Sequence, residues 1–522
     1  MRRFNVTGLC VPEEDYMVDI SDKLGQIKRL VDNRCYFTIN RARQYGKTTT
    51  LSMLHKKLTD EYICIRMSFE GVEDECFASA SSFCSTFIEL TTNALGFASV
   101  RAEYIEQWSD TTVTSFSQLS RHITRMCKNK KVVLMIDEVD KTSNNRVFLH
   151  FLSMLRDKFL ARKDGMDYTY HSVILVGVYD IKNIKMKLIN EGNYTQTAPE
   201  GKLYNSPWNI AVSFKVDMSF SSAEIATMLV EYEADHNTGM DIAIISDEIF
   251  NFTGGYPFLV SRICQCIDEE LNQDWSLNGV ITAAQILLRE RNTLFDDLFK
   301  NLENNKRLYN IIYDILIAGG TRTYSVGNPT VDMAEMYGII RDTGQGIAVS
   351  NRIFELAICD YFISKDEELP NKRIKGVLQF DVVTGGRFDM ELCLRKFAAH
   401  YAEIFNEHDA EFIEREGRLL FLSYLKPLIN GQGFYHIESQ FTDMRRMDIV
   451  VDFAREQFIV ELKLWRGESG HEEAYKQLAS YLESKNAPAG YLLTFDFRKG
   501  VNKRRSAQWV DYDGRRIFDV VI

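Results

Sequence analysis

The sequence predicts an α/β protein with a doubly wound parallel sheet in its N-terminal part and a second α/β domain near its C-terminus. Short apolar runs alternate with helical patterns over the first third of the chain, as a parallel sheet requires. The first apolar run, 36–40, is followed by Gly46-Lys47-Thr48 at the start of a helical pattern. Two later apolar runs, 447–453 and 458–464, carry acidic residues and precede another helix and strand.

Composition points to a folded chain of several domains. The 522 residues are enough for about three domains. Hydrophobic residues make up 45% and charged residues 26%, which is ordinary for a soluble globular protein. No apolar run approaches the ~18 residues of a membrane span, and the N-terminus lacks the apolar core of a signal peptide. The 10 cysteines have no metal-binding spacing, so we expect reduced thiols in a cytoplasmic protein without membrane partners.

The expected elements follow in order from the N-terminus. Apolar residues at helical spacing predict a helix from Ile20, ahead of the strand at 36–40. Further strands are predicted at 63–68, 132–136 and 172–178, with helices at 46–59, 78–97, 114–128 and 146–161. Parallel strands separated by helices build a doubly wound sheet, and ligands bind at the carboxyl ends of its strands.

The turn after the first strand predicts a phosphate-binding loop. Gly46-Lys47-Thr48 opens a helix, and backbone N–H groups at a helix N-terminus bind phosphate oxygens. Lys47 is expected to reach the β- and γ-phosphates of ATP, and Thr48 to place its hydroxyl on Mg²⁺. The other loop residues expected to contact the nucleotide are Arg43, Gln44, Tyr45, Gly46 and Thr49. Arg41 stands five residues before Gly46, where the strict motif has its first glycine.

Two acids at the end of the third strand complete the predicted ATP site. Asp137 is expected to hold Mg²⁺ through water, and Glu138 to polarise the attacking water. A solvated acidic turn is the alternative, but the Gly-Lys-Thr turn upstream favours nucleotide binding. After the fourth strand, Asp180 or Asn183 could sense the γ-phosphate, although an ordinary strand-to-helix turn is the simpler interpretation.

Helical patterns dominate residues 216–365. The run 253–257, Thr-Gly-Gly-Tyr-Pro, interrupts them, and proline suits the first turn of the helix that follows. Short apolar strands at 337–342 and 346–350 enclose a glycine-containing turn, and a final helix is predicted at 352–364. This order fits a winged helix, in which the two strands form the wing.

Acidic residues on two adjacent strands predict a metal site near the C-terminus. The strands form a hairpin in which Glu461 and Lys463 share one face, while Val460 and Leu462 face the core. Asp448 begins the partner strand, where it could meet Glu461 across the ladder. Two carboxylates and a lysine that converge in this way can hold Mg²⁺ beside an attacked phosphate. An exposed Glu-x-Lys strand is the structural alternative, but charges in so apolar a strand are costly without partners.

Residues outside the hairpin extend this predicted site. Gln477 and Tyr481 lie four apart on the next predicted helix, 472–482, and therefore share one face. Upstream, Glu416 begins a leucine-rich helix and could add a further metal-facing carboxylate. Glu414 competes for that role, and the sequence does not separate the two.

With these motifs in view, the chain resembles bacterial AAA-like ATPases related to the STAND group, fused to a PD-(D/E)xK nuclease-like domain. In that group Asn-Arg-x-Arg-x-x-Gly-Lys-Thr replaces the usual phosphate loop, and residues 40–48 match it. Asp137-Glu138 is similar to the Walker B motif, and 253–257 to the Gly-Gly-x-Pro motif of the helical lid. The resemblance covers about residues 1–365 and implies ATP and Mg²⁺ as cofactors.

The C-terminal resemblance implies a metal-dependent nuclease. The residues that match the PD-(D/E)xK pattern are Asp448, Glu461, Lys463 and Gln477, whereas Met447 stands where the signature has proline. We expect four domains, an ATPase core at 1–215, a helical lid at 216–285, a winged helix at 286–365 and the nuclease-like domain at 373–522. The charged run 365–372 is the best linker candidate.

Two functions are compatible with these features. In the first, the nucleotide state controls a Mg²⁺-dependent nuclease that acts on DNA through the winged helix and the C-terminal domain. In the second, the nuclease-like domain is inactive and binds nucleic acid or protein. The net charge of −11 gives no global basic field, so DNA contact needs local clusters such as 444–446, 498–499 and 503–505. The sequence does not distinguish DNA from RNA as the substrate, and it does not identify the trigger of the switch. It also reveals no arginine finger; a neighbouring subunit could supply one, so a homo-oligomer is a possible partner.

Overall fold

The computed structural model describes most of the chain and divides it into two compact units. The described residues are 2–98, 100–139, 146–178, 208–317, 322–325, 327–367, 382–404, 414–429, 433–436, 449–454, 456–496 and 505–522. One unit comprises Met1–Ala283 and Met336–Gly338, and the other comprises Ala284–Glu335 and Ile339–Ile522.

The first unit contains a parallel sheet whose described strands have the order β1-β4-β3-β2. The strands are β1 (Tyr36–Asn40), β2 (Ile63–Ser68), β3 (Val132–Asp137) and β4 (Ser172–Gly177). Every residue of β3 and β4 is buried, as in a parallel sheet covered on both faces. The predicted parallel sheet is therefore confirmed, and continuous apolar runs form its central strands.

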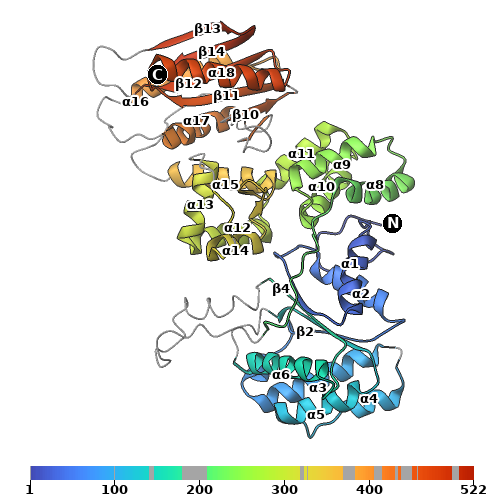
Figure 1. The fold of residues 1–522 in the computed structure, drawn as a ribbon. Helices are drawn as coiled ribbons and strands as arrows, with labels where there is room; N and C mark the ends of the chain where they lie inside the picture. Colours follow the sequence, from blue (N-terminus) through green and yellow to red (C-terminus); the bar gives the residue numbers. More distant parts are fainter. Residues whose placement is uncertain are drawn as a thin grey trace, which may run out of the picture. The chain divides into compact units, whose positions relative to one another are not determined.

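Helices cover both faces of this sheet. Figure 1 shows α1 and α2 on one side and α3, α5 and α6 on the other. Their bounds are α1 (Ser21–Asp32), α2 (Lys47–Leu58), η1 (Asp74–Phe77), α3 (Ala80–Gly96), α4 (Ala102–Trp108), α5 (Phe116–Cys127) and α6 (Arg146–Lys163). The short elements η1 and α4 were not among the predicted ones, because one or two helical turns carry too little periodicity to predict.

Four helices follow the described sheet in the chain. They are α8 (Ser222–His236), α9 (Ile242–Thr253), α10 (Pro257–Glu269) and α11 (Leu277–Arg289). Pro257 occupies the first position of α10, and Leu259, Ile263 and Ile267 are buried on its inner face. The predicted turn at 253–257 is confirmed, with Gly254 and Gly255 both in the left-handed region.

In the second unit, a helical segment precedes the C-terminal sheet. Its elements are α12 (Thr293–Asn304), α13 (Lys306–Leu316), α14 (Pro329–Met336), β5 (Ile340–Asp342), β6 (Ile347–Val349) and α15 (Arg352–Glu367). The strands β5 and β6 pair antiparallel, so the hairpin predicted at 337–350 is present, with shorter strands. We call residues 293–367 the α12–α15 segment.

The C-terminal sheet is mixed, and its described strands have the order β13-β14-β12-β11-β10-β9. Strands β11, β12 and β14 run parallel, whereas β9, β10 and β13 pair antiparallel with their neighbours. Their bounds are β9 (Gly433–His436), β10 (Ile449–Phe453), β11 (Glu456–Leu464), β12 (Ala489–Phe495), β13 (Ser506–Tyr512) and β14 (Arg515–Val521). A small hairpin, β7 (Val383–Thr384) and β8 (Arg387–Phe388), precedes it.

Both faces of this sheet are covered. The helices are α16 (Met390–Ile404), α17 (Glu414–Ile429) and α18 (Glu468–Ser484). One buried cluster joins α18 to the sheet and includes Leu478, Leu482, Ile459, Leu492 and Ile517. On the other face the ring of Phe495 lies 5.6 Å from that of Tyr401 in α16. The second α/β domain predicted from the sequence is confirmed.

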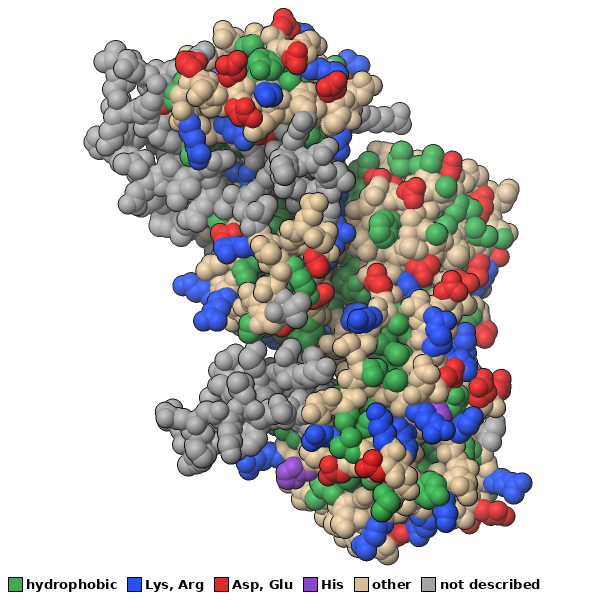
Figure 2. All heavy atoms as spheres, in the orientation of Figure 1, with side chains coloured by type: hydrophobic (Ala, Val, Ile, Leu, Met, Phe, Trp, Pro, Cys, Tyr) green, Lys and Arg blue, Asp and Glu red, His purple; other side chains and the backbone are tan. Residues whose placement is uncertain are grey.

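Charged side chains of both signs lie on the visible surface, and the cysteines are thiols rather than disulfides. On the face that Figure 2 shows, Lys and Arg side chains are interspersed with Asp and Glu. All 10 cysteines are free thiols. Within the described ranges, no helix is long and apolar enough to cross a membrane.

Candidate ATPase and nuclease sites

The phosphate loop turns sharply between β1 and α2. Gly46, the residue before α2, has a φ of 71°, and Gln44 has a φ of 55°. Glycine adopts this left-handed conformation without steric cost, whereas for Gln44 it is uncommon. Such strain persists where the surrounding structure fixes the backbone, and it clusters at ligand sites.

Lys47 is buried and held by the loop itself. Only 6% of its surface is exposed. Its Nζ donates to the carbonyl oxygen of Arg41 at 3.0 Å and to that of Ala42 at 2.8 Å. The ammonium therefore lies within the turn whose backbone N–H groups would bind phosphate.

Thr48 and Asp137 meet at the carboxyl edge of the sheet. The Thr48 hydroxyl donates to Oδ2 of Asp137 at 3.0 Å, although β4 separates their strands. The other carboxylate oxygen, Oδ1, accepts from the Glu138 backbone N–H at 3.0 Å, and Glu138 has a φ of 54°. A hydroxyl and a carboxylate in contact offer the hard oxygen ligands that Mg²⁺ prefers.

Two other residues predicted to contact the nucleotide, Thr49 and Arg43, lie on or beside the phosphate loop. Thr49 Oγ1 accepts from the Cys10 backbone N–H at 3.3 Å, and Arg43 is exposed on the loop. Asp180 and Asn183, the two candidate γ-phosphate sensors, lie outside the described residues.

Arg41, which replaces the usual first glycine, joins the loop to the chain ahead of α8. Its Nη2 donates to the carbonyl oxygen of Val216 at 3.0 Å, and its guanidinium lies 5.5 Å from the Phe214 ring. Its Nη1 donates to the Asn40 carbonyl at 2.8 Å. A glycine could make none of these contacts, so the substitution adds an anchor to the loop.

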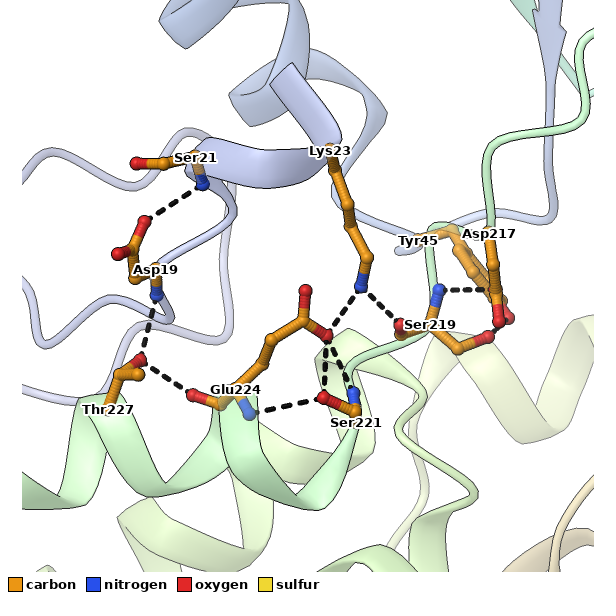
Figure 3. Close-up of polar contacts among 9 residues, drawn as sticks. All are labelled: Asp19, Ser21, Lys23, Tyr45, Asp217, Ser219, Ser221, Glu224 and Thr227. Carbon is orange, nitrogen blue, oxygen red and sulfur yellow. Dashed lines mark hydrogen bonds and ion pairs between the residues drawn. The ribbon is translucent and has the colours of Figure 1, made fainter. Parts of the chain in front are cut away.

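Tyr45 makes a second contact from the loop to the same segment. Its hydroxyl lies 2.6 Å from Oγ of Ser219, and Figure 3 shows this pair beside Asp217 and Lys23. Burial raises the pKa of the Tyr45 hydroxyl, and the Ser219 hydrogen bond opposes that shift. No local sequence pattern predicts this contact, because 174 residues separate its partners.

In the C-terminal sheet, Glu461 is completely buried and paired with Lys463. The distance from Lys463 Nζ to Glu461 Oε1 is 2.7 Å, and the lysine side chain is 32% exposed. Strand alternation places Glu461 on the face of Ile459, which α18 covers. Val460 and Leu462 are buried on the opposite face as expected, but the Glu461 face is buried too.

Asp448 lies outside the described residues, immediately before β10. The described register pairs Ile449 of β10 with Val460 of β11. The next residue along β11 is Glu461, so the described part of the ladder ends one step before the predicted pair. Among described residues, no group of three acidic, His or Cys side chains is close enough to hold a metal ion.

The remaining predicted residues of this site lie on helices. Gln477 is half-buried and Tyr481 is buried on α18, which follows β11 directly. The helix expected to begin at Glu416 begins at Glu414, so both candidate carboxylates belong to the first turn of α17. Their side chains lie outside the described set.

A buried polar cluster was missed by the sequence interpretation. His471 Nε2 lies 3.1 Å from Oδ2 of Asp519, and the Tyr475 hydroxyl donates to the same oxygen at 2.9 Å. Asp519 lies on β14, whose register places it beside Leu492 and hence two strands from Glu461. An aspartate in the apolar strand 515–521 was the available signal.

Polar contacts join the α12–α15 segment to the C-terminal sheet. Arg352 Nη2 lies 2.8 Å from Asp452 Oδ2 on β10, the strand that follows Asp448. Arg418 on α17 donates to the carbonyl oxygen of Ile317 at 2.8 Å and is 3% exposed. These contacts reach α17, which carries Glu416, and β10, the strand that pairs with the Glu461 strand β11.

Asp360 of α15 adds two further contacts to the same interface. Its Oδ1 accepts from the Tyr435 hydroxyl on β9 at 3.0 Å and lies 3.0 Å from Lys426 Nζ on α17. The same region contains a cavity lined by Leu356, Asp360, Lys426, Phe434 and Tyr435 among others.

Comparison with known proteins gives matches over most of the chain. A family model described as an AAA-like domain matches residues 23–362, and one described as the PD-(D/E)XK nuclease superfamily matches residues 434–506. An uncharacterized WD repeat-containing protein of Synechocystis sp. is 25% identical over 243 residues, which are 43% of this chain. The match spans only 18% of that protein.

Solved structures of low sequence identity are also similar. A Walker-type ATPase of Pyrococcus abyssi gives a TM-score of 0.45 at 12% identity, covering 68% of this chain and 99% of its own. The Aeropyrum pernix ORC2 protein in ADPNP–ADP complexes gives a TM-score of 0.37 at 12% identity, covering 69% and 97%. On the strength of the family match over residues 23–362, this chain belongs to the AAA-like domain family, and its residues 434–506 match the PD-(D/E)XK nuclease superfamily.

Proposed function

We propose that this protein is an ATP-dependent switch whose nucleotide state controls a Mg²⁺-dependent nuclease acting on DNA. In this proposal the ATPase core spans 1–215, the lid 216–285, a winged helix 286–365 and the nuclease domain 373–522. The single observation that carries the nuclease assignment is the buried Glu461–Lys463 pair at 2.7 Å.

The ATPase half of the proposal assigns a role to each residue at the sheet edge. Lys47 binds the β- and γ-phosphates, and Thr48 and Asp137 hold Mg²⁺, which neutralises charge on the transferred phosphoryl group. Glu138 orients and polarises the attacking water. The loop residues Arg43, Gln44, Tyr45, Gly46 and Thr49 surround the phosphates. The 3.0 Å contact between Thr48 and Asp137 supports this assignment.

The nuclease half depends on the cost of burying Glu461. A carboxylate with no solvent exposure costs several kcal/mol to desolvate, and a buried ion pair does not in general stabilise a fold more than well-packed hydrophobic residues do. A hydrophobic residue would stabilise the strand equally well, so the pair is better explained by chemistry. Asp448 and Glu461 hold the metal with Glu416 as a further ligand, and Lys463 and Gln477 orient water and phosphate.

Control of the nuclease by the nucleotide requires a physical connection. Arg352 and Arg418 connect the α12–α15 segment to β10, which pairs with the Glu461 strand β11, and to α17, which carries Glu416. A displacement of this segment would therefore act on both elements at once. The lid precedes this segment in the chain, and we propose that its nucleotide-dependent movement drives that displacement.

DNA is the proposed substrate, and it would be held by local basic clusters. The net charge is −11, so long-range attraction to DNA is weak. Arg505 begins the described part of the cluster 503–505, whereas the clusters 444–446 and 498–499 lie outside the described residues. Cleavage should consequently decline as salt increases, and the steepness of that decline should report how many phosphate contacts the basic clusters make.

The test is cleavage of plasmid and linear DNA with Mg²⁺ or Mn²⁺, with and without ATP. Glu461→Gln should abolish cleavage and leave ATP hydrolysis unchanged, while Glu473→Gln, an exposed change on α18, should retain both activities. Lys47→Ala should abolish ATP binding, while Lys56→Ala, an exposed change on α2, should retain it.

Each result has a definite meaning. Metal-dependent cleavage that Glu461→Gln removes, and that ATP changes, supports the whole proposal. Cleavage at the wild-type rate in Glu461→Gln would refute the assigned metal site. ATP hydrolysis without cleavage of DNA or RNA under any condition would instead establish the alternative, an ATP-regulated binding module with an inactive nuclease fold.

A further inference from the structure

We infer that Tyr45 is a positioning residue that connects the phosphate loop to the lid through Ser219. The inference deepens the ATPase half of the proposed function and is independent of the nuclease half. Tyr45 is the residue directly before Gly46-Lys47, and its hydroxyl lies 2.6 Å from Ser219 Oγ, three residues before the first residue of α8.

Alternate residues of the phosphate loop contact the proposed lid. We call residues 216–221, which lead into α8, the lid entry. Arg41 donates to Val216, Tyr45 pairs with Ser219, and the carbonyl of Arg43 between them accepts from the Tyr256 hydroxyl at 2.5 Å. The proposed phosphate-binding loop is therefore hydrogen-bonded directly to residues of the proposed lid.

Packing reinforces these hydrogen bonds. The Tyr45 and Tyr256 rings are 4.6 Å apart and meet edge to face at 70°, a favoured aromatic geometry. A β-carbon on Gly46 would contact Pro257 at 3.9 Å, so the first turn of α10 lies close to the loop. The loop cannot move far without displacing the lid residues 256–257.

On its other side, the lid entry is anchored to the first helix. Lys23 of α1 donates to the Ser219 carbonyl and to Glu224, both at 2.6 Å. Glu224 in turn closes a capping box with Ser221 at the start of α8. Figure 3 shows Ser219 between the two anchors, with Tyr45 on one side and Lys23 on the other.

Because Lys23 fixes one side of Ser219, a movement of Tyr45 changes the geometry at the start of α8. Phosphate binding at the loop supplies such a movement. The backbone between residues 43 and 46 carries the strained φ of Gln44 and the contacts of Tyr45 together. The Tyr45–Ser219 hydrogen bond thus connects the phosphate loop to the residues directly before α8.

The experiment measures nucleotide-dependent amide exchange of residues 216–227 in the full chain. Wild-type protein, Tyr45→Phe, Ser219→Ala and the double variant are compared with and without a non-hydrolysable ATP analogue. Tyr62→Phe is the matched control, since it removes a hydroxyl that donates to Asp32 at 2.7 Å, remote in sequence from loop and lid. Analogue affinity, kcat, KM and thermal stability are measured on the same variants.

In wild-type protein the analogue should slow exchange of this peptide. Each single variant should lose that protection by about two- to tenfold, the range of one hydrogen bond, and the double variant should lose no more than either single one. Affinity for the analogue should change by less than about threefold, because each substitution removes one hydroxyl and keeps Lys47 and the backbone N–H groups of the loop, while kcat falls. Tyr62→Phe should match wild type.

Three results would overturn the inference. They are wild-type protection in Tyr45→Phe, additive losses in the double variant, and an equal loss in Tyr62→Phe, which would indicate general loosening. A wild-type chain that binds the analogue without protecting residues 216–227 would overturn it as well. Failure of the ATP site is distinguished beforehand, because the wild type would then not bind the analogue at all.

Discussion

Gly255 offers the sharpest test of how the turn at 253–257 is built. Its φ is +74°, and a β-carbon at this position would lie 1.8 Å from the carbonyl oxygen of Phe220. The Phe220 N–H donates to the Gly255 carbonyl at 2.8 Å, so the two backbones are in direct contact. Gly255→Ala must therefore separate the turn from the segment that leads into α8.

A control glycine in the same run of helices, α8–α11, isolates the steric part of this effect. Gly239, between α8 and α9, has a nearly equal φ of +77°, but a β-carbon there would meet no atom within 4 Å. Gly239→Ala should cost only the left-handed strain, about 1–2 kcal/mol. Gly255→Ala should cost the same strain plus at least about 1 kcal/mol for the lost Phe220 bond, and more for disrupted packing. We expect a difference of about 2 kcal/mol or more, roughly a factor of 30 in local opening.

Native-state amide exchange is the appropriate assay, because a chain with two compact units does not unfold as one two-state system. The opening free energy of the first turn of α10 is read in both variants against wild type. ATP-analogue affinity should also fall in Gly255→Ala, since Tyr256 contacts the phosphate loop. Equal opening free energies in the two alanine variants would refute the claim that backbone contact at Phe220 demands glycine.

Three further predictions concern charge and metal binding. Burial raises the pKa of Glu355 to about 7, from an ordinary 4.5. The folded protein thus retains a proton that the unfolded chain loses, and stability from this group is present below pH 4.5 and lost as pH rises through 7. Glu355→Gln should flatten that loss in urea midpoints measured from pH 4.5 to 8, and an unchanged slope would contradict the assignment. Arg352→Glu should weaken the ATP response of DNA cleavage by placing like charges in contact, and adding Asp452→Arg should restore it; failure of the reversed pair to restore the response would exclude this ion pair as a connection. Thr48→Ala should lose the Mg²⁺-dependent part of ATP affinity while retaining the metal-independent part, as titrations with and without EDTA would show, and Thr48→Ser should recover it.

The elements that could be predicted from the sequence are those with strong local patterns. β3 is one continuous apolar run because both of its faces are covered, and that pattern identifies a central parallel strand. The Gly46-Lys47-Thr48 turn was equally predictable, since glycine and a helix start mark it locally. The contact between Thr48 and Asp137 then follows from the fold, because carboxyl ends of parallel strands share one edge.

The parts that sequence reasoning missed depend on distant segments. The bond from Arg41 to Val216 joins residues 175 apart, and no periodicity reports such a pairing. β13 lies at a sheet edge and has only half-buried and exposed residues, so its apolar signal is weak. Likewise, nothing within residues 458–464 reveals that α18 covers the Glu461 face, which converts an expected open site into a buried one.

In the proposed ATP site, the two hydrogen bonds that hold Lys47 have a consequence for nucleotide affinity. A free lysine side chain loses about 1.5–2 kcal/mol of rotamer entropy when it is fixed. Here the carbonyls of Arg41 and Ala42 already fix the ammonium, so the side chain loses this entropy when the protein folds. Phosphate binding then causes no further loss of that kind. The saving corresponds to about 10- to 30-fold in nucleotide affinity. A lysine at this position in a loop lacking those two carbonyl contacts would bind the same phosphates correspondingly less tightly.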